Sequence, residues 1–184
     1  MRILNLALMI CSAASLRIHS AVRSSPVRSS RMTGLRMGLS RGAQFPADAL
    51  EKFGVAGEKA VIFFFGQDDA PSCSKQIAAF NENFAAFEAA GVSVVGVRSY
   101  AFALTRYPVQ TTDSKVSFVV DENDAVRKQI DIKADMFGFL GGRETYVVDA
   151  AGKVVAVHNA QMDVESHVKV ALDAIPTLKR AELR

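Results

Sequence analysis

The sequence has 184 residues and a formal net charge of +3, a length that allows one ordinary domain and an extension. Residues 1–47 contain seven arginines and no lysine or acidic residue, whereas residues 48–184 contain 15 basic and 19 acidic residues. The positive charge therefore belongs to the N-terminal segment, and the rest of the chain lacks the basic balance of a nucleic-acid-binding domain.

The N-terminal segment has the composition of a targeting sequence. Residues 3–10 form an apolar run behind Arg2, and small residues follow at 12–15, which is the layout of a secretory signal and too short to span a membrane. Residues 17–41 are rich in Arg and Ser and free of acids, as in an organellar transit peptide. We expect a cleaved leader over residues 1–42 and a plastid location. A mitochondrial presequence and a basic arm that binds nucleic acid are the alternatives, and no aromatic residue lies between the arginines for base stacking.

Cysteine usage excludes several kinds of site. The chain contains Cys11 and Cys73, and Cys11 lies in the segment expected to be removed. The mature chain then keeps Cys73 alone, which excludes an intrachain disulfide, a CxxC redox site and a cysteine-based zinc site.

Residues 45–184 read as one domain of alternating strands and helices, which predicts an α/β fold. A short lead-in at 45–53 has Pro46 as a helix start. Strands are expected at 60–65, 92–97, 116–120, 144–149 and 153–157, and helices at 72–90, 100–107, 121–130 and 164–178. Gly91 ends the helix at 72–90, Asp121 or Asn123 caps the helix at 121–130, and the last two strands form a hairpin.

Cys73 lies where the first predicted strand, after a short loop, gives way to a helix. A thiol in the first turn of a helix lies near unpaired backbone N–H groups and the positive end of the helix dipole, which stabilise a thiolate relative to a thiol. Free cysteines are also commonly small buried hydrophobic residues. From this pattern alone, Cys73 is either reactive or structural.

Two blocks of sequence resemble the peroxiredoxins of the plant chloroplast Q type and their bacterial relatives. Residues 125–153 share with that family the motifs VRK, ADxFG and GRxTYVxD and a following GK turn, and residues 71–76 resemble its PGCTKQ motif. Asn159, Gln161 and His167 resemble its C-terminal stretch. The similarity covers about residues 57–178 and implies a thioredoxin-like fold with a central mixed β-sheet flanked by helices.

The resemblance implies reduction of hydrogen peroxide and alkyl hydroperoxides through a cysteine sulfenic acid, as part of antioxidant defence and redox homeostasis. Cys73 occupies the position of the peroxidatic cysteine, and Ala70, Pro71 and Ser72 would line the peroxide site. Arg143 matches the arginine that stabilises the thiolate and the charge that develops on the breaking O–O bond. A surface arginine paired with Glu144 is the alternative for Arg143.

The chain departs from the family pattern at two functional positions. Ala70 and Gly66 replace the family's threonine and proline before the cysteine, and Ala78 stands where many Q-type members carry a resolving cysteine. Loss of the threonine hydroxyl removes a hydrogen bond to a charged group, worth roughly 1.5–3 kcal/mol. We therefore expect a one-cysteine variant whose sulfenic acid is reduced by an external thiol: thioredoxin, glutaredoxin or glutathione.

Other candidate sites are weaker. The acidic residues at 68–69, 121–124, 131 and 135 lack a nearby histidine or a tight ligand spacing, and neither His158 nor His167 has a second histidine at ligand spacing. We expect no metal, no cofactor, no nucleic acid and no membrane insertion of the mature protein, which we take as a monomer. We expect the apolar side chains of Met136, Phe137, Phe139 and Leu140 to form an exposed patch, either a rim over the cysteine or a partner surface. The alternative function is that of a non-catalytic thioredoxin-fold module, either a redox sensor or an interaction protein.

Overall fold

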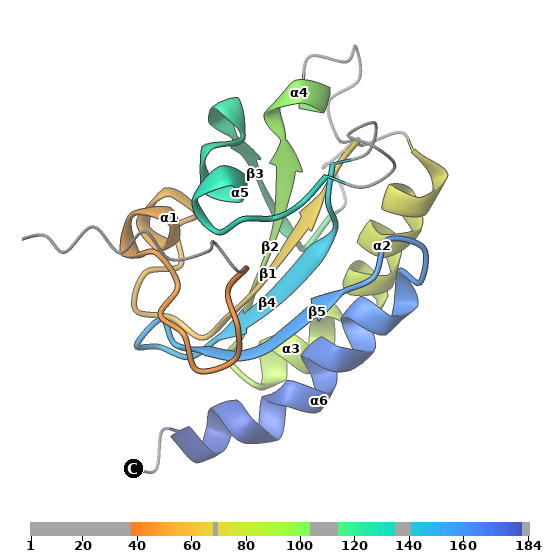
Figure 1. Cartoon of the computed structure of the whole chain (residues 1–184). Helices are drawn as coiled ribbons and strands as arrows, with labels where there is room; N and C mark the ends of the chain where they lie inside the picture. The colour runs from red at the N-terminus through yellow and green to blue at the C-terminus, as the bar shows by residue number, and fades with distance from the viewer. Residues whose placement is uncertain (1–37, 68–69, 104–113, 135–140, 182–184) are drawn as a thin grey trace, which may run out of the picture. The chain divides into compact units, whose positions relative to one another are not determined.

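The computed structural model describes residues 38–67, 70–103, 114–134 and 141–181. Contacts divide the chain into residues 1–34 and 35–184, and all described residues belong to the second unit. A five-stranded sheet with helices against both faces forms this unit (Figure 1). This architecture confirms the expected α/β class.

The sheet is mixed, with the strand order β3-β2-β1-β4-β5. β1, β2 and β3 are parallel, whereas β4 is antiparallel to both β1 and β5. All five expected strands are present, with ends within two residues of those predicted. The strands are β1 (Ala60–Phe65), β2 (Ser93–Ser99), β3 (Ser117–Asp121), β4 (Glu144–Val148) and β5 (Val154–Asn159).

Helices cover the two faces of the sheet unequally. α1 and α5 pack on one face, and α2, α3 and α6 pack on the other (Figure 1). The α6 helix contains Pro176 near its C-terminal end. The bounds are α1 (Ala47–Lys52), α2 (Pro71–Glu82), α3 (Phe84–Ala89), α4 (Tyr100–Ala103), a 3-10 turn η1 (Glu122–Asp124), α5 (Ala125–Gln129) and α6 (Glu165–Ala181).

β1 supplies both hydrophobic cores because it lies at the centre of the sheet and successive side chains point to opposite faces. Ile62 and Phe64 belong to the core beneath α1 and α5. Val61, Phe63 and Phe65 belong to the core beneath α2, α3 and α6. Every residue of this strand is therefore buried, on one face of the sheet or the other, which explains why the strand is a continuous apolar run.

One expected helix, at residues 72–90, is two helices in the structure. Asn83 separates α2 from α3 with φ −97° and ψ 6°. Its side-chain amide donates to the carbonyl oxygen of Ala79 at 2.9 Å, and asparagine side chains that bond nearby backbone groups compete with helix formation. The prediction of one continuous helix was wrong for this reason. Gly91 follows α3 with a φ of +62°, as expected for a helix end.

The helix expected at residues 121–130 is regular only in its second half. Asn123 and Asp124 have positive φ values of 56° and 51° and belong to the 3-10 turn η1. The Asp121 carboxylate accepts hydrogen bonds from the backbone N–H groups of Val126 and Arg127 at 3.0 and 2.9 Å. Asp121, and not Asn123, therefore satisfies the first N–H groups of α5.

The remaining expectations agree with the structure where residues are described. Pro46 precedes α1, and Gly152 has the positive φ of 76° that the turn between β4 and β5 requires. Part of the helix expected at 100–107, the apolar side chains at 136–140, and residues 1–37 of the leader lie outside the described residues. Among the helices that are described, none is long and apolar enough to cross a membrane.

Candidate active site

The junction between β1 and α2 places Cys73 in the first turn of α2. Pro71 occupies the first helical position, where its missing N–H group costs nothing, and Ala70 precedes it without a side-chain cap. The N–H group of Cys73 donates to the Ala70 carbonyl oxygen at 2.9 Å. Because proline has no N–H and that of Cys73 is bonded, few backbone donors remain beside the sulfur. Stabilisation of a thiolate here therefore depends chiefly on side chains.

Arg143 supplies the nearest positive charge. Its Nη2 atom lies 3.2 Å from the Sγ atom of Cys73 and 3.0 Å from the Oγ atom of Ser72. Both Arg143 and Cys73 are buried, with 2 % and 3 % of their surfaces exposed. The guanidinium therefore places a positive charge and hydrogen-bond donors against the sulfur in a site with little water.

Glu144 is not the partner of Arg143 in the structure. Its carboxylate accepts hydrogen bonds from the hydroxyl group of Tyr146 and, at 2.6 Å, from the side-chain amide of Asn159. Burial and the bond to Glu144 raise the pKa of Tyr146, so its hydroxyl stays protonated and acts as a donor. These contacts leave the guanidinium of Arg143 directed at the start of α2.

Some buried polar atoms of this site have no hydrogen-bond partner within the described residues. They are Nε and Nη1 of Arg143 and both side-chain amide atoms of Gln76, which lies three residues after Cys73 on the same helix. Gln76 is fully buried. Unpaired buried donors are costly, typically by about 1–3 kcal/mol each. The site therefore has unused capacity to bind a small polar molecule.

A second buried polar group lies next to Arg143 along β4. Thr145 Oγ1 and His167 Nδ1 are 2.8 Å apart, and His167 Nε2 lies 2.8 Å from the Ala160 carbonyl oxygen. A carbonyl only accepts, so Nε2 carries the proton and the Thr145 hydroxyl donates to Nδ1. Burial, with repulsion from His158 and Arg143, lowers the pKa of His167 to about 4. His167 is therefore neutral near pH 7.

His158 and His167 lie closer than their sequence spacing suggested. Their rings are 4.7 Å apart in an edge arrangement, and His158 Nε2 lies 2.7 Å from the Ser166 hydroxyl. Among the described residues, no group of three His, Cys, Asp or Glu side chains is placed to hold a metal ion.

The other residues singled out from the sequence surround the same helix start. Pro71 is exposed, Ala70 and Ser72 are half-buried, and Ala78 is exposed on α2. Gln76 and Arg127 have no role predictable from the sequence, although both lie within the motifs that carried the resemblance. Their burial and their contacts with distant parts of the chain become visible only in the folded structure.

Two hollows lie beside α2. The hollow next to Cys73 has a volume of about 390 Å³, and its lining joins the first turns of α2 to the segment that enters α6: Pro71, Ser72, Lys75, Met162, Asp163, Val164 and Glu165. Ser72, which accepts a hydrogen bond from Arg143, lines this hollow, whereas Cys73 and Arg143 do not. The Met162 side chain is 84 % exposed at its rim.

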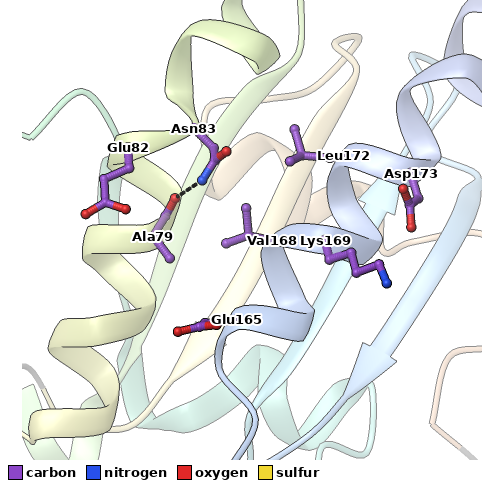
Figure 2. A pocket seen from close by; sticks show the side chains of 8 residues that line it. All are labelled: Ala79, Glu82, Asn83, Glu165, Val168, Lys169, Leu172 and Asp173. Carbon is purple, nitrogen blue, oxygen red and sulfur yellow. Dashed lines mark hydrogen bonds between the residues drawn. The ribbon is translucent and has the colours of Figure 1, made fainter.

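The second hollow is a groove of about 470 Å³ between the C-terminal half of α2 and α6. Figure 2 shows Ala79 and Asn83 on one side and Val168 and Leu172 on the other. Neither Cys73 nor Arg143 lines this groove.

Comparisons with known proteins identify the family. The AhpC/TSA family model matches residues 44–157. Chloroplastic peroxiredoxin Q of Sedum lineare is 34 % identical over 131 residues, which are 71 % of this chain and 69 % of that protein. Chloroplastic peroxiredoxin Q of Oryza sativa subsp. japonica is 33 % identical over 132 residues, and the chain spans 60 % of its length.

A solved structure supports the same assignment. The bacterioferritin comigratory protein of Xanthomonas campestris, whose structure addresses alkyl peroxide reduction by that protein, is 25 % identical with a TM-score of 0.53. The match covers 66 % of this chain and 80 % of that one. The expected thioredoxin-like fold is therefore confirmed. The chain belongs to the AhpC/TSA family, within the peroxiredoxins of the Q type, which are thiol peroxidases.

Proposed function

We propose that this protein reduces hydrogen peroxide and small alkyl hydroperoxides with Cys73 as its single reacting cysteine. The observation that carries the proposal is the 3.2 Å contact between Arg143 Nη2 and Cys73 Sγ in a buried site. This contact favours a thiolate, and the thiolate is the nucleophilic form of cysteine.

In the proposed oxidation step, the Cys73 thiolate attacks the terminal oxygen of the peroxide. An S–O bond forms while the O–O bond breaks, the sulfur loses two electrons to the peroxide, and water or an alcohol leaves after taking up a proton. Arg143 faces the sulfur through Nη2, and its Nε and Nη1 atoms have no partner among the described residues. We infer that these donors hold the peroxide and stabilise the charge on the departing oxygen.

Reduction of the Cys73 sulfenic acid requires an external thiol in this proposal, because Ala78 occupies the position of the usual resolving cysteine. The first thiol forms a mixed disulfide with Cys73 and releases water, and a second thiol or a paired cysteine then releases Cys73 as a thiol. Glutathione, glutaredoxin and thioredoxin are the candidate reductants. The hollow beside Ser72 and Lys75 gives them an approach to the first turn of α2.

We infer that residues 1–42 are a targeting segment removed from a mature domain at residues 45–184. The arginine-rich, acid-free composition of the segment supports this division. The names of the plant relatives as chloroplastic favour a plastid over a mitochondrion. The mass of the mature protein, purified from its own cells, tests the cleavage site directly.

The test of the proposed function compares Cys73→Ser with a variant that moves the thiol by one residue, Cys73→Ser with Ser74→Cys. Ser74 is exposed, so the second variant keeps one thiol on the same helix away from Arg143. After one equivalent of hydrogen peroxide, mass spectrometry should show rapid addition of oxygen to the parent alone. Multiple turnover with glutathione and glutaredoxin should also occur in the parent alone.

Two outcomes would contradict the proposal. Equal oxidation of the parent and the moved-thiol variant would mean that the site gives Cys73 no special reactivity. Rapid oxidation without turnover by any of the three reductants would instead favour a redox sensor over a peroxidase.

A further inference from the structure

Arg127 is a buried arginine that contacts neither Cys73 nor Arg143 through a hydrogen bond. Its side chain makes hydrogen bonds to three backbone carbonyl oxygens: Nη1 to Gly142 at 2.6 Å, and Nη2 to Phe65 at 2.5 Å and to Val97 at 3.2 Å. It is 5 % exposed, and its guanidinium carbon lies 5.2 Å from the centre of the Phe64 ring. A buried cation is costly unless such partners surround it.

The three carbonyl groups belong to the segments that carry the site. Phe65 is the last residue of β1, from which the chain enters the loop to Cys73. Gly142 directly precedes Arg143, and Val97 lies in β2 beside β1. A single guanidinium therefore joins the segment that leads to the thiol with the segment that leads to the arginine.

Strand pairing does not make this connection. The register of β1 with β4 runs from Ala60 and Val148 to Phe63 and Thr145, and it stops there. Phe65 and Arg143 lie beyond the last pair, at the end of the sheet that faces the site. Arg127 thus supplies hydrogen bonds between the two segments where the β1–β4 ladder has ended.

The surroundings of Arg127 fix its position. The Asp121 carboxylate accepts a hydrogen bond from the backbone N–H group of Arg127, and the carboxylate of Asp124 lies 3.8 Å from its Nε atom.

Gly142, whose carbonyl oxygen accepts a bond from Arg127, is also held closely. A Cβ atom on Gly142 would lie 2.0 Å from the Lys133 carbonyl oxygen, so only glycine fits at this close approach. Burial lowers the pKa of Arg127 to about 10, and it remains charged at neutral pH.

We propose that Arg127 is a positioning residue of the peroxidase site, which holds the end of β1 and the Gly142–Arg143 segment together so that Arg143 meets Cys73. This inference rests on the proposed function. Arginine suits the role because its planar fork donates several hydrogen bonds in fixed directions, whereas a lysine ammonium is a compact charge on a flexible stem.

The test is a cycle of Arg127→Lys, Arg143→Lys and the double variant in the full chain. Each protein is checked for folding by circular dichroism and then oxidised with hydrogen peroxide in stopped flow. Arg127→Lys should slow oxidation about tenfold. It should slow alkylation by iodoacetamide much less, because alkylation does not need Arg143 to orient a peroxide. In the Arg143→Lys background it should have little further effect, since residues that act through one another are not additive.

A matched control separates positioning from simple loss of stability. Val148→Ala removes buried volume from β4 at the end of the sheet away from the site, so it should lower the melting temperature without changing the oxidation rate. If Arg127→Lys does not fold, Phe64→Leu removes the ring beneath the guanidinium and should slow peroxide oxidation about threefold, again without effect in the Arg143→Lys background.

The outcomes distinguish this inference from the proposed function. A parent protein that peroxide does not oxidise would overturn the proposed function itself. If peroxide oxidises the parent, two results would show that Arg127 has only a structural role. The first is an Arg127→Lys variant that is oxidised as fast as the parent. The second is a double variant whose oxidation rate is reduced by the product of the two single-variant reductions.

Discussion

Cys73 and Arg143 are 70 residues apart in the sequence, yet their side chains are in hydrogen-bond contact. Motif resemblance identified both, because each lies in a short block whose residue types are characteristic of the family. Arg127 and Gln76 lie in the same two blocks, but their residue types alone do not reveal what they bind. Arg127 bonds carbonyl groups, which every residue carries, and Gln76 differs from an exposed glutamine only by its burial.

Replacement of Arg143 by lysine tests the value of the guanidinium geometry. Arg143→Lys keeps the charge but loses the planar guanidinium, whose Nη2 atom contacts both Cys73 and Ser72. Hydrogen peroxide should oxidise this variant about tenfold to a hundredfold more slowly, since the lost contacts act on the transition state. Stopped-flow oxidation measures the effect, with the exposed Arg180→Lys as the control. Equal rates for the two variants would make Arg143 a structural residue.

At the scale of elements, the α2 helix was predictable in its start and its buried face but not in its end. Pro71 and the spacing of Ile77 and Phe80 gave the start and the face. The break at Asn83 depends on a bond between a side chain and the Ala79 carbonyl group, which apolar spacing does not report. As a result, α2 is a short helix that does not continue into α3.

Ala70 precedes α2 in the extended conformation of an N-cap residue, with φ −66° and ψ 129°, and no side chain caps the helix. Ala70→Thr should add a capping hydroxyl worth about 1 kcal/mol of stability. The same hydroxyl should bond the thiolate and raise the oxidation rate about tenfold. Urea unfolding and stopped-flow oxidation measure the two effects, with Ala70→Val as the control of equal size. An unchanged rate would show that residues 66–70 do not follow the family geometry.

Ala78→Cys tests whether α2 can open after oxidation. In an α-helix, residues five apart have Cα atoms about 8 Å apart, which is beyond the reach of a disulfide. A bond between Cys73 and the new cysteine therefore requires the first turns of α2 to unwind. The break at Asn83 separates these turns from α3, so we expect a disulfide after peroxide treatment and a gain of thioredoxin-dependent turnover.

Mass analysis without reducing agent decides this prediction. Accumulation of Cys73 sulfinic acid without a disulfide would mean that α2 stays folded while the sulfur is oxidised further. Ala86→Cys is the matched control, because Ala86 is exposed on α3, beyond the helix break at Asn83. This variant should form no disulfide with Cys73.

For the whole molecule, the order of strands and helices was predictable because β1 and the other strands carry long apolar runs between clear turn signals. The structure adds the way in which distant segments meet. β4 lies between β1 and β5, which places Thr145 and Arg143 beside α2 and α6. Local sequence patterns do not predict that these residues lie close together, because their proximity depends on the order of strands in the sheet.

Burial of His167 predicts how the stability of the whole domain depends on pH. Its pKa is about 4 in the folded protein and about 6.5 in an unfolded chain. Between these values the unfolded state binds the additional proton, so stability is complete above pH 6.5 and falls as the pH is lowered toward 4. The total loss is on the order of 3 kcal/mol. Urea unfolding at several pH values measures it.

His167→Asn is the control for this prediction, because asparagine can accept the bond from Thr145 but does not titrate. The variant should be less stable near pH 7 and should lose less stability on acidification. A pH dependence identical to that of the parent would assign the effect to other groups.

The position of β4 beside β1 also has a consequence for the order in which a newly made chain completes its site. β1, α2 and Cys73 leave the ribosome about 70 residues before Arg143, a delay of about 4–14 s at 5–20 residues per second. During this interval Cys73 lacks its contact with Arg143, because Arg143 and β4 have not yet been made. If Arg143 activates Cys73 as proposed, the thiol gains this activation only after Arg143 and β4 have been made and have joined the sheet.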